Sequence, residues 1–275
     1  MASQALTHWD PEDPVFWETE GCGIANRNLW ISIPSLALAF SVWMMWSVVV
    51  VNLPNAGFAF SIRELFWLSA LPALCGAGLR VVYSFMVPIF GGRRWTAIST
   101  ALLLLPTLGM GFAVRDPSTP YSTFVVLALL CGFGGGNFAS SMANINFFFP
   151  RVQKGTALGL NAGLGNLGVS LVQFVVPMVI TAGLFGALGG EPQTWRQGSE
   201  TGQMWLQNAG FIWVPFIAIC AIAAWLWMDD LATARASLSQ QMIIFRSKHT
   251  WIMCWLYLGT FGSFIGYSAG FPLLS

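Results

Sequence analysis

The sequence predicts an all-α protein whose helices cross a membrane several times. Of its 275 residues, 56% are hydrophobic and only 8% are charged, whereas a soluble domain carries about 25% charged residues. The apolar residues also gather in runs of roughly 20 or more, the length that a helix needs to span a bilayer. Twelve Lys and Arg against eleven Asp and Glu leave a formal charge of +1, so no basic surface indicates nucleic-acid binding.

The first expected element is a polar tail over residues 1–29, which contains five acidic residues and two prolines. It lacks the basic start and short apolar core of a cleavable signal peptide. Polar stretches at 189–203 and 229–249 interrupt the apolar sequence further on. Seven apolar runs are each expected to form one membrane helix, at residues 30–53, 65–90, 95–114, 121–148, 155–186, 205–228 and 250–273.

The distribution of Lys and Arg predicts a cytoplasmic N-terminus. In that orientation eight Lys and Arg residues lie inside and three lie outside, in agreement with the positive-inside rule. Residues 30–228 then form a six-helix bundle, 229–249 a cytoplasmic linker, and 250–275 the first helix of a second bundle. This organisation is typical of the first half of a twelve-helix carrier, whose two related halves enclose a site at the midplane. We therefore expect the C-terminal half to be missing from the chain.

A complete seven-helix receptor or light-driven pump is the alternative architecture. Retinal proteins attach their chromophore to a lysine in the last helix, and residues 250–275 contain no lysine. A receptor would usually place its N-terminus outside, against the distribution of Lys and Arg. Half a carrier is the better interpretation.

Metal and cofactor chemistry is not indicated by the sequence. It contains no CxxC pair and no Cys/His cluster, and His8 and His249 lie outside the apolar runs. No metal site and no cofactor are therefore expected. No pairing of a nucleophile with a base is apparent either, so the sequence does not predict an enzyme.

Arg80 is the one charged residue deep inside an apolar run, about 15 residues into the run at 65–90. An arginine at this depth costs about 2.5–3.5 kcal/mol on insertion scales, and no acidic residue of the runs lies at the same depth. The functional interpretation is an anion-binding site whose substrate is the counter-ion. A guanidinium grips a planar oxyanion by two parallel hydrogen bonds. The alternative is an arginine that extends to the membrane surface.

Polar residues recur along one face of the run at 121–148. Asn137, Ser141 and Asn144 fall at i, i+4 and i+7, so they share a helix face. They either line a water-filled path or join helices by hydrogen bonds. Phe138 lies beside them, and the edge of its ring carries partial positive charge that can flank a small anion. Packing is the alternative role for this one phenylalanine.

Glycines are concentrated in the next run, where residues 154–173 read KGTALGLNAGLGNLGVSLVQ. Small residues let membrane helices approach closely and slide past one another. A dinucleotide-binding loop is not indicated, because no strand precedes the glycines. The five glycines are Gly155, Gly159, Gly163, Gly165 and Gly168.

Four segments of the sequence are distinctive: PEDPVFWETEGCGIANRNLWISIP, GGNFASSMANINFFFP, KGTALGLNAGLGNLGVS and YLGTFGSFIGYSAGF. At these segments the chain resembles the nitrate/nitrite porter family of the major facilitator superfamily. The resemblance covers about residues 9–275 and includes the glycine-rich nitrate signature of the fifth helix.

The resemblance implies the major facilitator fold and a transporter of nitrate and nitrite that works by alternating access in the bacterial inner membrane. It implies that Arg80 grips the anion, that Phe138 packs against it and that Asn166 lies near the site. Tyr257 and Phe261 would complete one side of the pocket. These two are i and i+4, so they share a helix face, and only the tyrosine can donate a hydrogen bond.

Two features depart from the family pattern. The loop between the second and third helices usually carries an Asp-Arg pair before Gly-Arg-Arg, and Ile89 and Phe90 stand there instead. The usual charge lock of that loop is therefore in doubt. The family also has a second arginine in its eighth helix, within the half that we expect to be missing.

The coupling mode follows from the lack of titratable groups. No Asp, Glu, His or Lys is expected inside the membrane helices, so no proton relay is apparent. This favours nitrate/nitrite antiport over proton-coupled nitrate symport. An anion channel would share Arg80 and the polar stripe and is a less favoured alternative, as is a seven-helix receptor.

Overall fold

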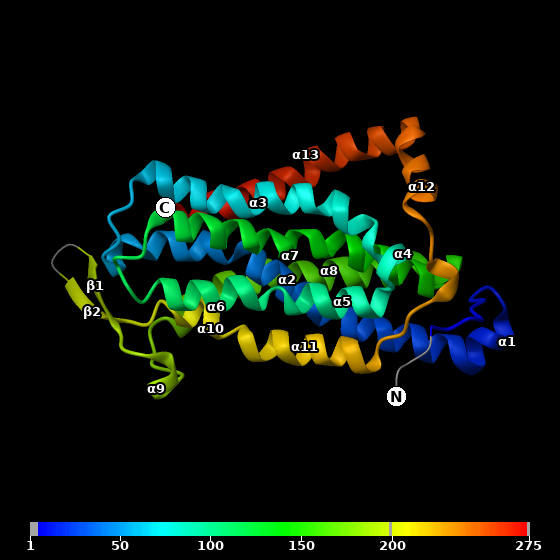
Figure 1. The fold of residues 1–275 in the computed structure, drawn as a ribbon, viewed down its shortest axis with the longest axis horizontal. Coiled ribbons are helices and arrows are strands. Elements are labelled where there is room, and N and C mark those ends of the chain that lie inside the picture. Colours follow the sequence, from blue (N-terminus) through cyan, green and yellow to red (C-terminus); the bar gives the residue numbers. More distant parts are fainter. Residues whose placement is uncertain (1–4, 198–199, 274–275) are drawn as a thin grey trace.

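Long helices that lie side by side dominate the structure, a computed structural model that describes residues 5–197 and 200–273 (Figure 1). The longest are α2 (Cys22–Asn52), α3 (Ile62–Ser84), α7 (Tyr121–Phe148), α8 (Arg151–Val179) and α13 (Lys248–Gly270). Two pairs of shorter helices follow one another: α5 (Gly92–Ala101) with α6 (Leu104–Ala113), and α10 (Asn208–Phe211) with α11 (Val214–Trp227). The remaining α-helices are α1 (Pro14–Phe16), α4 (Met86–Phe90), α9 (Gly186–Gly189) and α12 (Leu238–Gln241).

Six helical segments among the described residues are long and apolar enough to cross a membrane. They correspond to the first six apolar runs of the sequence. The seventh run forms α13, which is not among the six. Helix α13 contacts α2 and α3, and much of its surface is exposed. The six segments are Pro14–Asn52, Ile62–Ser84, Gly92–Ala113, Tyr121–Phe148, Arg151–Val179 and Asn208–Trp227.

The first helical segment begins well before residue 30, where the apolar run starts. The Asp13 side chain accepts a hydrogen bond from Val15 N at 3.0 Å, and Pro14 occupies the first helical position. Both features favour a helix start. One turn of π-helix (Trp17–Gly21) then leads directly into α2. Much of the predicted polar tail is therefore helical.

Two of the predicted helices are interrupted by tight turns. In the run at 95–114, Pro106 has no backbone N–H to bond the carbonyl of Leu102. That carbonyl accepts from Leu105 N instead, at 3.2 Å. Pro215 stands just after the turn that separates α10 from α11. Each break therefore lies next to a proline.

A β-hairpin occupies most of the polar stretch at 189–203. Strand β1 (Gln193–Gln197) pairs in antiparallel fashion with β2 (Glu200–Met204), at one end of the bundle (Figure 1). The Gln193 side chain donates to Gln207 Oε1 at 2.8 Å, which fixes the hairpin beside α10. These strands carry no apolar alternation, the signal by which a strand is predicted from sequence.

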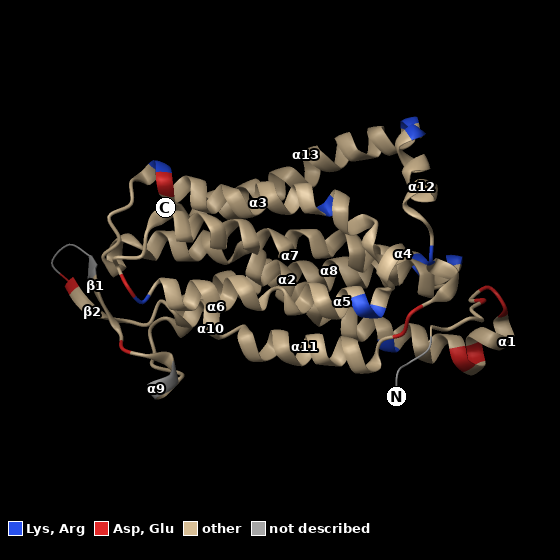
Figure 2. Cartoon of the chain, in the orientation of Figure 1, with Lys and Arg blue, Asp and Glu red and all other residues tan. Residues whose placement is uncertain are grey.

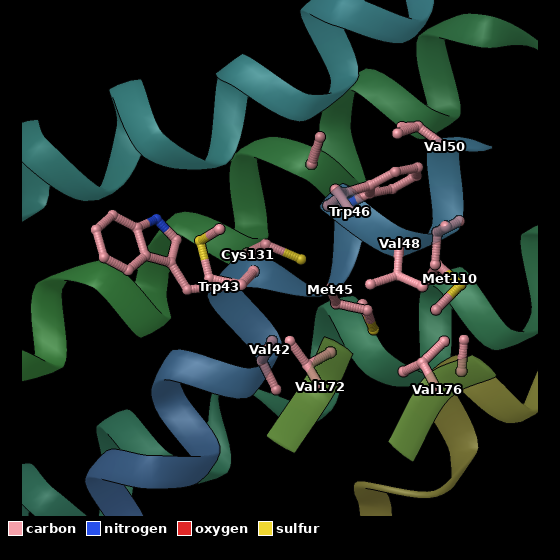
Figure 3. Close-up of a cluster of buried hydrophobic side chains, with 14 of the residues drawn as sticks. Val42, Trp43, Met45, Trp46, Val48, Val50, Met110, Cys131, Val172 and Val176 are labelled. Carbon is pink, nitrogen blue, oxygen red and sulfur yellow. The ribbon is translucent and has the colours of Figure 1, made fainter. Parts of the chain in front are cut away.

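Helix α2 lies at the centre of the hydrophobic core. Figure 3 shows side chains of this helix, including Trp46, meeting residues that are distant in the sequence. Met110 comes from α6, Cys131 from α7, and Val172 and Val176 from α8, and all four are fully buried. The same core also includes Leu65 and Leu68 of α3, Ala209 of α10 and Ile217 of α11, so it joins all six membrane-crossing segments around α2.

Glycines set the distance between α2 and its neighbours α7 and α8. A side chain at Gly134 would collide with the backbone of Ala39, and one at Gly168 would place its Cβ 2.9 Å from the Cβ of Phe40. Ser41 Oγ donates to the carbonyl of Gly168 at 2.9 Å. Close backbone approach of this kind requires residues without side chains.

The five predicted packing glycines of α8 divide into two groups. Gly168 faces α2 as described, and a side chain at Gly165 would meet Leu36, which also lies on α2. The other three face open space, with no atom within 4 Å of an added Cβ, namely Gly155, Gly159 and Gly163. Within the described residues, only two of the five therefore act in helix packing.

Charged residues gather at the two ends of the bundle, and its middle is almost free of them (Figure 2). At one end, two acidic residues after α11 bind other helices. Asp229 accepts from Arg27 Nη2 at 2.7 Å and from Asn28 Nδ2 at 2.8 Å. Asp230 accepts from the backbone N–H of Arg93 at 2.8 Å. The start of α5 and the first turns of α2 are thereby tied to the end of α11.

The loop between α3 and α5 holds its position without the usual Asp-Arg pair. Asp230 lies 3.7 Å from Arg93 Nε and 3.9 Å from Arg94 Nε. Phe90 stacks on Trp95, with ring centroids 5.7 Å apart. The two arginines of Gly-Arg-Arg therefore find their acidic partner in the segment that follows α11, although Ile89 and Phe90 replace the usual pair.

The N-terminal residues and the segment after α11 lie at the same end of the bundle (Figure 1). Leu6 N donates to Asp230 O at 2.8 Å, and Ala232 N donates to Leu6 O at 3.0 Å. Trp9 Nε1 donates to Phe147 O at 3.1 Å. The tail is therefore attached both to the linker and to the end of α7.

Candidate functional site

Arg80 lies in a cavity of about 360 Å³ between α2, α3 and α13. The cavity is mostly apolar, and its walls include Trp43, Tyr257 and Phe261. Small residues of α3, Ala73 and Ala77, line the wall on the side of the arginine. The predicted mid-helix position of Arg80 thus brings a single cation into an apolar pocket.

Four aromatic rings from three helices surround the guanidinium. Its central carbon lies 4.3 Å from the ring centre of Phe261 and 5.9 Å from that of Tyr257, both on α13. Phe138 of α7 lies at 5.0 Å and Trp43 of α2 at 5.2 Å. Ring faces attract a cation most strongly where water is excluded. The rings therefore stabilise a half-buried positive charge without neutralising it.

The hydrogen bonds of Arg80 leave part of the guanidinium unused. Arg80 Nε donates to the carbonyl of Gly135 at 3.0 Å, and Nη1 lies 3.5 Å from the Tyr257 hydroxyl. The Nη2 atom is buried and has no hydrogen-bond partner. Among the described residues, no carboxylate forms an ion pair with Arg80. The site can therefore accept an anion on the free edge of the guanidinium.

Four of the five predicted substrate-binding residues come together. The rings of Tyr257 and Phe261 stack at 5.1 Å, and that of Phe138 lies 5.9 Å from Phe261. Asn166 does not join them: its side chain donates to Ala162 O of its own helix at 2.8 Å. Its Oδ1 atom is buried without a partner, and no hydrogen bond links it to Arg80.

Trp43 belongs to the site and was missed by the sequence analysis. Its Nε1 donates to Pro72 O at 2.6 Å, and its ring stacks on Phe261 at an interplanar angle of 13°. A Cβ added at Gly76 or at Gly135 would lie 2.6 Å from the indole, so these glycines form the slot that receives it. The only signal in the sequence was the glycine cluster at 132–136, which leaves room for a large ring on a neighbouring helix.

The polar stripe of α7 is buried between helices of the bundle. Asn137, Ser141 and Asn144 are all buried. Ser141 Oγ lies 2.8 Å from Ser32 Oγ and accepts from Asn161 Nδ2 at 2.8 Å. These contacts correspond to the interpretation of hydrogen bonding between helices, one of the two that the sequence left open.

Comparison with known proteins places this architecture in a family. The model of the Major Facilitator Superfamily matches residues 35–275. The chain belongs to the major facilitator superfamily. The predicted polytopic helical fold is thereby confirmed, as is the prediction of a multi-pass membrane protein that is not an enzyme.

Several members of this superfamily are similar to the chain over nearly all of its length. The nitrate/nitrite transporter NarU of Escherichia coli (strain K12) is 56% identical over 272 residues, which are 98% of this chain and 58% of the relative. The probable nitrate/nitrite antiporter NarK2 of Thermus thermophilus is 49% identical over 270 residues, 98% of this chain and 60% of the relative. The nitrite extrusion protein of Bacillus subtilis (strain 168) is 24% identical over 255 residues, which are 90% of this chain and 57% of the relative.

The resemblance to the nitrate/nitrite porters is thus confirmed within the superfamily. The superfamily member described here spans less than two thirds of the length of each of these relatives. Its predicted site residues all lie within the residues that the family model matches.

Proposed function

We propose that this chain forms one side of a carrier that binds nitrate and nitrite at Arg80 and moves them by alternating access. The observation that carries the proposal is the state of Arg80, which is half-buried in an aromatic pocket, with a buried Nη2 that has no hydrogen-bond partner and no ion pair to a carboxylate among the described residues. A cation that is largely removed from water without a fixed counter-ion is unfavourable unless a ligand supplies the negative charge. The names of the similar proteins indicate the chemistry of that ligand.

The proposed binding mode follows from the shapes of the two partners. Nitrate is a planar oxyanion, and two of its oxygens match the parallel N–H groups of a guanidinium edge. The hydroxyl of Tyr257 donates a further hydrogen bond. Phe138 and Phe261 lie over the faces of the bound pair and exclude water, which strengthens the electrostatic attraction. Asn166 has no part in this arrangement.

The proposed transport cycle uses two bundles. Residues 30–228 form the first bundle, 229–249 a cytoplasmic linker, and 250–275 the first helix of the second bundle. The similar proteins are longer than this chain, and a second bundle would supply the opposite wall of the pocket. Rocking of the bundles about the anion then exposes Arg80 to each side in turn. The proposed location is the bacterial inner membrane with the N-terminus inside, which the distribution of Lys and Arg supports.

The proposed coupling is exchange of nitrate for nitrite. Among the described residues that line the Arg80 cavity, none is an Asp, Glu, His or Lys, so the pocket offers no side chain to carry a proton. We expect vesicles that contain the protein to take up labelled nitrate only when nitrite is present inside. External alkalinisation that accompanies nitrate uptake into nitrite-free vesicles would instead support proton-coupled symport.

The same vesicles distinguish a carrier from an anion channel. A carrier gives a saturable nitrate flux that internal nitrite stimulates. A flux that rises linearly with nitrate and ignores internal nitrite would contradict the proposed carrier and support a channel.

Replacing Tyr257 by Phe is expected to weaken nitrate binding about five- to tenfold, because one hydrogen bond of about 1 kcal/mol is lost. The ring that covers Arg80 remains. Nitrate affinity measured by calorimetry or by counterflow tests this. Tyr267→Phe is the matched control, since Tyr267 lies on the same helix and is exposed, and Phe271 is the one ring it stacks on among the described residues. Unchanged affinity in Tyr257→Phe would show that its hydroxyl does not reach the anion.

A further inference from the structure

A second cavity lies inside the bundle, between α2, α5 and α7. It has a volume of about 10 Å³, which is close to the space that a single water molecule needs. All but one of the residues that line it are serine, threonine or asparagine, in contrast to the apolar core around α2. The residues that line it are Ser32, Ser35, Leu36, Thr96, Ser99, Thr100, Asn137, Ser140 and Ser141. Buried polar groups that face such a cavity need a hydrogen-bond partner inside it.

The donors of this wall are largely in use already. Ser141 and Ser32 share a hydrogen bond, and Ser141 also accepts from Asn161. Three further hydroxyls donate to carbonyl oxygens of their own helices: Ser35 to Ile31 at 2.9 Å, Ser99 to Thr96 at 3.3 Å, and Ser140 to Asn137 at 3.2 Å. A hydroxyl that donates in this way keeps its oxygen lone pairs as acceptors. The wall is therefore rich in acceptors.

Asn137 shows that one acceptor is unsatisfied. Its side chain is 5% exposed, and its Oδ1 atom is buried without any hydrogen-bond partner. A buried amide oxygen without a donor is destabilising. The occupant of the cavity must therefore be small and must donate hydrogen bonds or carry positive charge.

We propose that this cavity binds one water molecule, which donates hydrogen bonds to Asn137 Oδ1 and to a serine hydroxyl oxygen of the wall. Buried waters in proteins satisfy polar groups of this kind. A cation such as Na⁺ is less favourable, because none of the residues that line the cavity is a carboxylate to offset its charge. Nitrate is far too large for the space and is an acceptor itself.

The water would fix α5 to α2 and α7 at one point. Asn137 lies between Gly135, whose carbonyl binds Arg80, and Phe138, whose ring covers it. The bound water would therefore also hold the part of α7 that contacts the arginine. The proposal itself depends only on the cavity and its acceptors, and not on which anion the Arg80 site binds.

A density map of the full-length protein, at a resolution that reveals ordered waters, is the direct test. We expect a single peak within hydrogen-bond distance of Asn137 Oδ1. An empty cavity in such a map would overturn the proposal. Thermal unfolding in sodium and in choline buffers, at equal ionic strength, is the second measurement. An equal Tm supports water, and a higher Tm in sodium would overturn the proposal in favour of a cation.

Variants add a third test that does not depend on a map. Asn137→Ala and Ser99→Val, which removes a hydroxyl and fills the space, are each expected to lower the Tm by about 2–6 °C. Thr107→Val is the control, because Thr107 is also buried and also donates to carbonyl oxygens close by in its own sequence, but it is not among the residues that line the cavity. A Tm for Ser99→Val above that of the wild type would show that the cavity prefers an apolar filling, which contradicts a bound water.

Discussion

Replacing Arg80 by Ala is expected to abolish nitrate uptake. The substitution removes the half-buried positive charge and the parallel hydrogen bonds on which the proposed anion site depends. Two charge-assisted hydrogen bonds contribute roughly 3 kcal/mol or more, which corresponds to at least a hundredfold loss of affinity. Uptake of labelled nitrate into vesicles, together with calorimetric binding on the purified protein, measures both consequences. Arg80→Lys is expected to restore little binding, because an ammonium lacks the planar fork.

Arg63→Ala is the matched control for the Arg80 variant. Arg63 lies near the start of the same helix and is exposed, so its loss should leave nitrate binding unchanged. A circular dichroism spectrum and Tm close to those of the wild type would show that Arg80→Ala is folded. Wild-type uptake by a folded Arg80→Ala protein would remove the basis of the proposed function.

Replacing Gly168 by Ala is expected to destabilise the bundle severely. The added methyl group would press against the backbone of Ala37 and the Cβ of Phe40 on α2, and neither can rotate away. Overpacking against backbone costs about 3 kcal/mol, which corresponds to a fall in Tm of roughly 6–12 °C. The same change weakens the hydrogen bond from Ser41 to the Gly168 carbonyl. Thermal unfolding of the protein in detergent measures the effect.

Gly163→Ala provides a control of the same chemistry on the same helix. Gly163 has no atom within 4 Å of an added Cβ, so the substitution only gains helix propensity, up to about 1 kcal/mol. We therefore expect the two variants to change the Tm in opposite directions. Equal losses of stability in both would mean that close approach of α2 and α8 is not what requires Gly168.

The helices and the central cation were predictable because their signals are local. A run of about 20 apolar residues demands a helix in a membrane, since the backbone must bond to itself. Arg80 stood out because a charged side chain in such a run has an unfavourable free energy of membrane insertion. Tyr257 and Phe261 share a face by simple helical spacing, and the structure brings both to Arg80. Each of these predictions depends only on the sequence of a single helix, and not on how helices pack together.

Trp43 escaped prediction because its role depends on how helices pack. Trp43 is one of 14 tryptophans, and only the slot at Gly76 and Gly135 distinguishes it. Asn166 was placed in the site by family resemblance, yet in the structure its amide bonds to its own helix. The breaks next to Pro106 and Pro215 and the polar hairpin were missed for a different reason. Their signals are a few residues long and are outweighed by the composition around them.

The ion pair between Arg27 and Asp229 has a consequence for biosynthesis. The two residues are 202 positions apart in the sequence, so a ribosome makes the acid long after the base. In the proposed orientation Arg27 is an unpaired cation while the first helix enters the membrane, when positive charge directs that end to the cytoplasm. Asp229 neutralises it only after the sixth segment has been inserted. The same guanidinium would thus first direct the orientation of the first helix and later form the ion pair that joins α2 to the segment after α11 in the folded bundle.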